Sequence, residues 1–219
     1  YLLIAGDLVD GVGIYPNQED ELSIKDIYKQ YDYFFSLLDG LPDGVDVILI
    51  PGNHDGVRRG EPQPAIPKEY VKERDGVYLR GSPTWFSIHG VKFLMYHGTS
   101  IDSYIASVSD LSYAKPEDVV VEMLIRRHLS PMYGKNLIVP EAKDYLVVDE
   151  VPDVVHMGHV HKNGITEYRG VLVVSSGTWQ DWTDYQKMQG HIPTPGIATV
   201  YNMKKGSVTT LDFVGANYG

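Results

Sequence analysis

Three side chains that can coordinate a metal or relay a proton stand in a row at Asn53, His54 and Asp55. They follow Pro51 and Gly52, which are sufficient to make a turn after the apolar run VDVILI. An amide, an imidazole and a carboxylate add nothing that such a turn requires. The segment PGNHD therefore predicts a functional loop.

Side chains of the same kinds follow other apolar runs. The carboxylates of Asp7 and Asp10 come after the first run, and the imidazole of His97 comes after a later one. His159 and His161 belong to the motif GHVH. Carboxylate, amide oxygen and imidazole without a thiolate form a borderline-hard donor set, which suits Mn²⁺, Fe or Zn²⁺. Two histidines separated by one residue of extended backbone point to the same side, so GHVH can offer both rings to one pocket.

Each motif by itself also has a structural explanation. A Gly-Asp pair after a strand is common, and a lone histidine such as His97 is more often a packed, hydrogen-bonded residue than a ligand. GHVH alone is as easily a coincidence as a metal motif. The four motifs together, each at the end of a predicted strand, favour one shared metal site.

Short apolar runs between turn residues predict the strands that position these motifs. They lie at 1–5, 45–50, 91–96, 154–157 and 171–174, and a hairpin is predicted from 196–202 and 207–214. A strand, a helix and a strand in sequence form a βαβ unit, which indicates a layered α/β fold. In open α/β sheets, functional side chains gather at the carboxyl ends of the strands.

Two helices are predicted. Apolar residues at helical spacing indicate the first, between the first two strands, with Ser23 and Asp26 as an N-terminal cap pair and Gly40 as its stop. The second runs from Pro116 to about His128.

The composition limits the class of protein. The 219 residues carry a formal net charge of −10, and 43% of them are hydrophobic, as in an ordinary globular domain. No apolar run approaches the roughly 20 residues that a membrane helix needs. There is no cysteine, hence no disulfide, which fits a cytoplasmic, intracellular protein. The negative charge gives no general attraction for nucleic acid, so a phosphate substrate requires metal ions or local cations.

The motifs GDLVD, GNHD, the strand-terminal HG and GHVH, in this order, resemble those of the calcineurin-like metallophosphoesterase superfamily. The resemblance spans almost all of residues 1–219 and implies an α/β fold, an αββα sandwich with a two-metal phosphoesterase site. It implies that Asp7 bridges both ions and that His161 binds the first ion. For the second ion it implies the ligands Asn53, His97 and His159.

The same resemblance implies the acid–base residues. His54 corresponds to the histidine that contacts the phosphate and protonates the leaving group, and Asp10 to the residue that orients its ring. A histidine held by a carboxylate is a suitable general acid near neutral pH.

One motif of the superfamily does not occur in this chain. It is an Asp-x-His sequence on an earlier strand, which supplies the first ion. The chain opens inside an apparent strand without an initiator Met, so we expect a domain truncated at its N-terminus that lacks this strand and motif. The second ion keeps four ligands, whereas the first keeps Asp7 and His161. We expect the segment alone to fill one metal site well and to have weak or no activity.

Longer stretches, among them LIPGNHDGVRRGEPQPAIP, MYHGTSIDSYI and VPDVVHMGHVHKNG, resemble the small subunits of archaeal family D DNA polymerases. This resemblance implies a proofreading 3′→5′ exonuclease that acts on the 3′ end of DNA with two divalent ions, Mn²⁺ or a similar metal. It also implies assembly with the large catalytic subunit. Two alternatives stay open: a phosphoesterase for another substrate, and a catalytically silent assembly subunit.

Candidates for contacts with a DNA strand are basic or aromatic. Arg58 and Arg59 lie next to GNHD and are the first candidates for substrate binding. The others are Arg126 and Arg127 on the second predicted helix, and Trp179, Trp182 and Tyr185 as stacking platforms.

Overall fold

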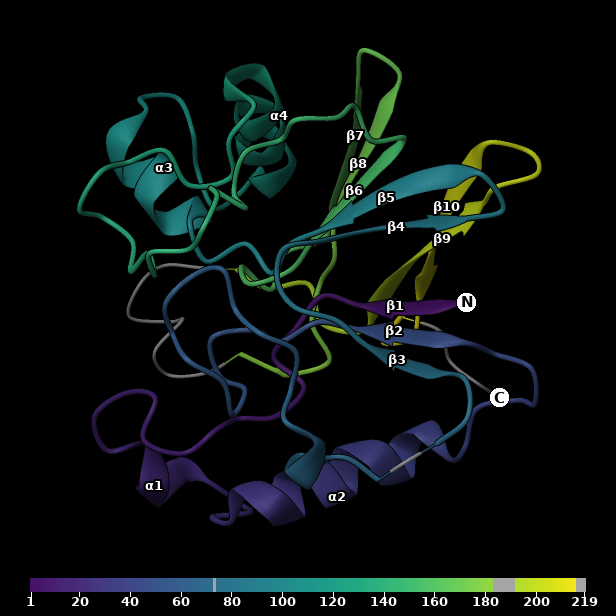
Figure 1. Ribbon diagram of the computed structural model, residues 1–219. Coiled ribbons are helices and arrows are strands. Elements are labelled where there is room, and N and C mark those ends of the chain that lie inside the picture. Colours follow the sequence, from purple (N-terminus) through teal and green to yellow (C-terminus); the bar gives the residue numbers. More distant parts are fainter. Residues whose placement is uncertain (73, 183–191, 216–219) are drawn as a thin grey trace.

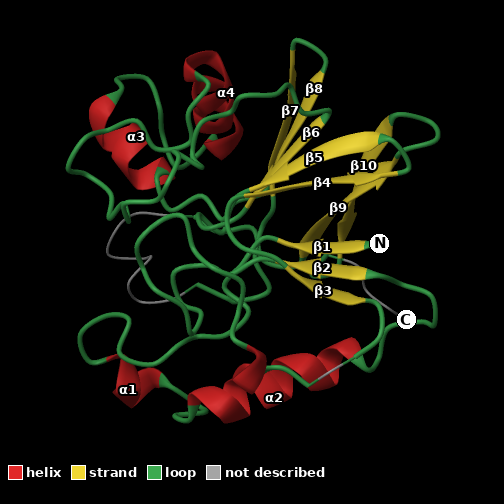
Figure 2. Ribbon diagram, in the orientation of Figure 1, coloured by secondary structure: helices red, strands yellow, loops and turns green. Residues whose placement is uncertain are grey.

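Two β-sheets face each other in the computed structural model, and helices cover their outer sides (Figure 1, Figure 2). The structure describes residues 1–72, 74–182 and 192–215. Within these residues, no helix is long and apolar enough to cross a membrane.

The smaller sheet contains three parallel strands in the order β1-β2-β3. They are β1 (Leu2–Ile4), β2 (Val47–Leu49) and β3 (Val77–Leu79). The short helix α1 (Gln18–Glu21) and the longer helix α2 (Ile27–Leu38) connect β1 to β2, and a 3₁₀ turn, η1 (Lys68–Tyr70), precedes β3. The predicted βαβ unit is therefore confirmed.

Helix α2 begins at Ile27 because the side chain of Asp26 caps it, accepting a hydrogen bond from the backbone N–H of Lys29 at 3.1 Å. The predicted pair of caps thus reduces to Asp26. Apolar residues along one side of α2 pack against the outer face of the smaller sheet, which forms one of three core clusters. Its buried residues include Tyr31, Phe35, Leu38, Val47 and Leu49.

The larger sheet contains five strands in the order β4-β5-β6-β8-β7. They are β4 (Thr84–Ile88), β5 (Val91–Met95), β6 (Val154–Met157), β7 (Gly164–Tyr168) and β8 (Val171–Ser175). The three central strands are mutually parallel, and β4 and β7 pair antiparallel at the two edges. Helices α3 (Ile101–Ser107) and α4 (Pro116–Arg126) pack on its outer face through Tyr104, Val120 and Met123.

A third cluster lies between the sheets and includes Ala5, Ile50, Phe93, Met95 and Val154. The layers are thus α2, the smaller sheet, the larger sheet, and α3 with α4. This is the expected αββα sandwich. The predicted hairpin is present as β9 (Ile197–Asn202) and β10 (Ser207–Asp212), with Asn202 opposite Ser207.

Elements that the sequence pattern did not indicate are short or only partly buried. Strands β3, β4 and β7 have mixed burial patterns, so their sequences lack the continuous apolar run on which the other predictions rest. Helix α3 spans seven residues and α1 four, too few to establish a helical period.

Candidate metal centre and active site

Four loops, each following a strand, bring metal-binding side chains to one point. Asp7 follows β1, Asn53 follows β2, His97 follows β5 and His159 follows β6. Asp7, His97 and His159 each place one ligand atom within 4.8 Å of the others. The Oδ1 atom of Asn53 lies 2.9 Å from Nε2 of His97 and 2.9 Å from Nδ1 of His159. We call these four residues the donor cluster.

Hydrogen bonds on the far side of the rings fix which nitrogen faces the donor cluster. The Nδ1–H of His97 donates to the main-chain carbonyl of Ala5 at 2.7 Å, which leaves Nε2 directed at Asp7, 3.3 Å from its Oδ2. His159 uses the opposite tautomer, because its Nε2 lies 3.1 Å from Oδ2 of Asp102 and its Nδ1 faces Asn53. Each ring therefore turns one nitrogen to the same point, where it can bind a metal ion once that nitrogen carries no proton.

Asp102 contacts the donor cluster through His159, and the sequence did not indicate it. It lies in the first turn of α3, and its Oδ1 accepts a hydrogen bond from the hydroxyl of Tyr113 at 2.9 Å. Carboxylates that hold the far nitrogen of a metal-binding histidine fix its orientation and raise its basicity. The only signal was its position five residues after His97 in HGTSID, which by itself predicts nothing.

Charges within the donor cluster depend on one another. Burial alone would lower the pKa of His97, but the adjacent carboxylate of Asp7 raises it to about 9. Burial alone would raise the pKa of Asp7, but the charges and hydrogen bonds of His97 and His54 hold it well below its usual range. A proton and an ionised carboxylate thus share the place where a divalent ion would bind, and the ion would displace that proton.

The chemistry of the donor cluster fits a divalent ion. One carboxylate oxygen, one amide oxygen and two imidazole nitrogens converge, and Mn²⁺, Fe and Zn²⁺ accept this set.

Backbone geometry around the donor cluster is unusual. Asp7, His159 and His161 have φ of 53°, 70° and 57°, a left-handed region that residues other than glycine rarely adopt. Such conformations cluster at functional sites. Gly52 allows the loops to approach closely, because a Cβ atom there would lie 2.1 Å from Oδ1 of Asp7 and 2.6 Å from the ring of His97. Its role is thus to make room, in addition to the bend expected from the sequence.

His161 does not join the donor cluster. The expectation of an extended GHVH segment is wrong, because His159 and His161 both have a left-handed φ. The role of His161 as a ligand of the first ion stays a prediction. The main-chain carbonyl of His161 accepts a hydrogen bond from the N–H of Thr194 at 2.9 Å. Burial lowers the pKa of His161 to about 4, although Asp7 opposes the shift, so this ring is neutral.

His54 lies at the edge of the donor cluster and is partly exposed. Its backbone N–H donates to Oδ1 of Asp7 at 2.9 Å, and its Nδ1 lies 2.8 Å from the main-chain carbonyl of Asp10. The expectation that the carboxylate of Asp10 holds this ring therefore needs correction. The backbone of Asp10 turns its carbonyl towards the ring of His54. Its carboxylate instead accepts a hydrogen bond from the side chain of Gln180 at 3.0 Å.

Asp55, the last residue of PGNHD, holds the loop together. Its buried carboxylate accepts hydrogen bonds from the backbone N–H groups of Gly52 and Leu8 and from the hydroxyl of Tyr31. Burial, together with the nearby charge of Asp7, raises its pKa to about 7. Asp55 thereby connects the loops after β1 and β2 to helix α2.

A sequence profile of the calcineurin-like phosphoesterase family matches residues 1–163. The chain belongs to this family. Members of the family are metallophosphoesterases, which agrees with the donor cluster at the carboxyl ends of four strands.

Relatives of this phosphoesterase include subunits of DNA polymerases. The DNA polymerase II small subunit of Archaeoglobus fulgidus is 48% identical over 220 residues, which cover 98% of this chain and 44% of that protein. The protein of the same name from Methanocaldococcus jannaschii is 47% identical over 208 residues, which cover 94% of this chain and 35% of that protein. The chain thus spans less than half the length of these relatives.

Solved structures resemble the phosphoesterase more distantly. An archaeal phosphodiesterase is 17% identical with a TM-score of 0.40, over 82% of this chain and 74% of that one. Vacuolar protein sorting 29 from Cryptosporidium parvum is 16% identical with a TM-score of 0.41, over 95% and 94%. At these scores neither structure adds to the assignment.

The two neighbouring arginines of the phosphoesterase point to different places. The guanidinium of Arg58 donates to the carbonyl of Pro62 and to the carboxylate of Glu141, at 2.7 and 2.6 Å. Arg59 donates to the main-chain carbonyls of Gly13 and Ile14, at 3.4 and 3.1 Å, and within the described residues it has no carboxylate partner. Arg59 alone of the pair therefore keeps an uncompensated charge for an anion.

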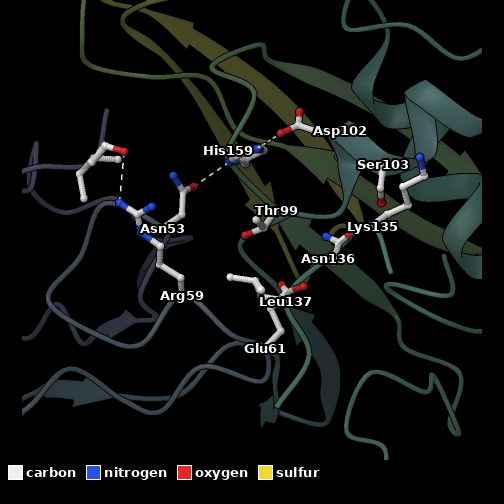
Figure 3. A pocket seen from close by; sticks show the side chains of 11 residues that line it. Asn53, Arg59, Glu61, Thr99, Asp102, Ser103, Lys135, Asn136, Leu137 and His159 are labelled. Carbon is white, nitrogen blue, oxygen red and sulfur yellow. Dashed lines mark hydrogen bonds and ion pairs between the residues drawn. The ribbon is translucent and has the colours of Figure 1, made fainter. Parts of the chain in front are cut away.

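Two clefts meet beside the donor cluster, and Asn53, Arg59 and Ile14 line both. The smaller, of about 280 Å³, contains His54. The larger, of about 480 Å³, extends from His159 towards α3 and residues 135–137 (Figure 3). Arg59 thus stands where a phosphate bound at the donor cluster would carry its two substituents into different clefts.

The remaining strand-contact candidates lie away from these clefts or outside the described residues. Arg126 pairs with Glu122 on α4, and Arg127 donates to main-chain carbonyls of Val148 and Asp149. The ring of Trp179 is mostly exposed and packs against Phe213 at 5.4 Å. Trp182 is also exposed. Tyr185 lies outside the described residues.

Proposed function

We propose that this chain is the phosphoesterase domain of an archaeal DNA polymerase small subunit and that it removes nucleotides from the 3′ end of DNA. The observation that carries this proposal is the donor cluster, with the imidazole of His54 at its edge. Beside it lies the guanidinium of Arg59, which has no carboxylate partner among the described residues. The similarity to two polymerase small subunits over more than nine-tenths of the chain supports DNA as the substrate.

The donor cluster would hold one of two divalent ions, Mn²⁺ in our proposal, and Asp7 with His161 would contribute to the other. When bound, the ions supply Lewis-acid activation of the phosphodiester. The residues of the chain do the rest. Arg59 offsets the charge of the phosphate, and His54 donates a proton to the departing 3′-oxygen of the preceding nucleotide. Asp10 keeps the ring of His54 in place through its carbonyl.

The acidic composition requires help in binding DNA. With a net charge of −10, the chain repels a polyanion except near Arg59 and the metal ions. The polymerase relatives are named small subunits, which implies a large subunit. We propose that this large catalytic subunit supplies most of the phosphate contacts.

The proposal is tested with the full-length protein that contains this chain, Mn²⁺ and a labelled single-stranded DNA. We expect stepwise shortening from the 3′ end, and His54→Asn should slow it by about 100-fold or more, because general acid catalysis contributes that much. His89→Asn is the matched control, since His89 is exposed and asparagine tolerates its φ of 50°. An intact 3′ end would instead favour the silent assembly subunit, and equal shortening by the His54 variant would exclude His54 as the general acid of a nuclease in this domain.

A further inference from the structure

The larger cleft has polar walls that the donor cluster does not use. Besides Asn53, Arg59 and His159, its lining includes Glu61, Thr99, Ser103 and Asn136 (Figure 3). At about 480 Å³ it lies within the range of small-molecule sites in proteins. It opens next to the donor cluster, so a molecule bound there can reach the ions with one end.

Three buried polar atoms of this lining have no hydrogen-bond partner among the described residues. They are Oε2 of Glu61, Oγ1 of Thr99 and Oδ1 of Asn136. Buried polar groups are normally paired, because leaving one unpaired destabilises the fold. Three such atoms in the walls of one cleft therefore point to a ligand that pairs with them after a small shift of the lining side chains.

Glu61 shows that the wall is built rather than accidental. The residue is 2% exposed, and its Oε1 atom accepts a hydrogen bond from the hydroxyl of Tyr96 at 2.5 Å. Its backbone fixes the opposite wall, because its N–H donates to the carbonyl of Leu137 and its carbonyl accepts from the N–H of Val139, both at 2.8 Å. Oε2 is thus held at a fixed place in the wall of the cleft.

The chemistry of the lining selects the ligand. Arg59 and Lys135 supply positive charge, and within the described residues neither has a carboxylate partner. Glu61, Asn136 and the carboxylate of Asp102 supply hydrogen-bond acceptors, and Thr99 supplies a hydroxyl. A ligand with an anionic end and several hydroxyl or amino groups matches this set, and a nucleoside 5′-monophosphate unit has both.

The position of His54 decides which nucleotide the cleft receives. In hydrolysis of the last phosphodiester, water adds to phosphorus and the bond to the 3′-oxygen of the preceding nucleotide breaks. That oxygen takes the proton, so the preceding nucleotide must lie on the side of His54, in the smaller cleft. The released 5′-mononucleotide then lies in the larger cleft, on the other side of Asn53 and Arg59.

We propose that the larger cleft binds the 3′-terminal nucleotide of the strand, with its phosphate at Asn53 and Arg59 and its sugar and base at Glu61, Thr99 and Asn136. This inference rests on the proposed nuclease function for the direction of the strand. It goes beyond that function in naming a sugar and base subsite, at Glu61, Thr99 and Asn136, whose residues are not metal ligands.

The subsite is tested by calorimetric titration of the full-length protein in Mn²⁺ with deoxyadenosine 5′-monophosphate and with methyl phosphate. We expect the nucleotide to bind at least about tenfold more tightly, because it pairs buried groups that methyl phosphate leaves unpaired. Thr99→Val and Asn136→Leu should each remove most of that advantage and leave methyl phosphate binding unchanged. Thr209→Val makes the same change as Thr99→Val at an exposed position of β10 and should have no effect.

Equal affinity for the two ligands in the unsubstituted protein would overturn the subsite and needs no variant. A nucleotide preference that both variants retain would also overturn it, since the nucleotide would then bind elsewhere. If the preference and its loss are observed but DNA is not shortened, the subsite stands and the exonuclease proposal fails. The two proposals thus fail by different measurements.

Discussion

The rings of His97 and His159 are locked, whereas the ring of His54 is held by a single main-chain contact. His97 is 1% exposed and is hydrogen-bonded to a carbonyl on the nitrogen opposite the donor cluster. His159 is hydrogen-bonded in the same way to the carboxylate of Asp102. His54 is partly exposed, and among the described residues its ring is hydrogen-bonded to the carbonyl of Asp10. Ion binding needs fixed lone pairs, while proton transfer needs access to the substrate, and the two regions differ accordingly.

Gly52→Ala should have the largest effect, because the added methyl group would collide with the carboxylate of Asp7 and the ring of His97. We expect Mn²⁺ affinity, measured by calorimetry, to fall by more than about 100-fold, beyond the usual effect of changing a residue around a metal site. Gly40→Ala, where the added group meets only ordinary contact at 3.4 Å, is the control. Unchanged affinity in Gly52→Ala would show that the donor cluster does not bind the ion.

Asp102→Asn tests whether the far-side hydrogen bond matters. Asparagine can still contact His159 but loses the negative charge that raises the basicity of the ring, so Mn²⁺ affinity should fall by about 10- to 100-fold. Asp118→Asn changes an exposed aspartate at the matching first turn of α4 and should leave it unchanged. A similar loss in both variants would mean that general charge, and not the ring of His159, is responsible.

The shared proton of the donor cluster predicts a pH dependence. Since the pKa of His97 is about 9, the ring is protonated at pH 7 and must lose its proton to bind an ion. Apparent Mn²⁺ affinity should therefore rise by about tenfold per pH unit between pH 6 and 8, with about one proton released per ion. Titrations in buffers of different ionisation enthalpy measure this release.

The same titrations should give one tightly bound ion per chain for this segment, and two would contradict the expected loss of ligands.

Arg59→Ala should weaken DNA binding and shortening by about tenfold, because an uncompensated charge beside the phosphate is removed. Arg58→Ala is its neighbouring control. That guanidinium is already paired with Glu141, so its loss should change either quantity by less than about threefold. Equal effects of the two substitutions would show that the contacts of Arg58 do not persist in the complex.

Asp10→Asn should have the smallest effect. The main-chain carbonyl that orients His54 is retained, and only the contact of the carboxylate with Gln180 changes. Shortening of DNA should therefore slow by less than about threefold, within the range of a weak polar contact. A loss as large as that of His54→Asn would mean that the carboxylate holds the ring when substrate is bound.

Most of the fold could be predicted from strong local patterns in the sequence. Continuous apolar runs gave β2, β5, β6 and β8, and Pro116 marked the start of α4. Partly buried strands such as β7 were missed because half-buried sequences show no such run. The sequence also placed Asp7, Asn53, His97 and His159 at strand ends, where parallel strands bring them together.

The details of the site depend on backbone conformation, which the sequence did not disclose. Nothing in GHVH indicates that His159 and His161 adopt left-handed φ, or that His159 but not His161 belongs to the donor cluster. The contacts of Asp10 and Arg58 differ from those expected for a related reason. Each depends on which atoms of the loop face His54 or Glu141, and the sequence does not determine this. Asp102 comes from a helix whose placement over β5 no local motif encodes.

The left-handed backbone of Asp7 and His159 also has an evolutionary consequence. Each such residue costs the fold on the order of 1 kcal/mol relative to glycine, which adopts that conformation without strain. Selection for stability alone would therefore replace both residues by glycine. In a lineage that had lost the chemistry, these positions should drift to glycine or asparagine early. Their identity across homologues would then distinguish subunits that still hold metal from those that keep only the scaffold.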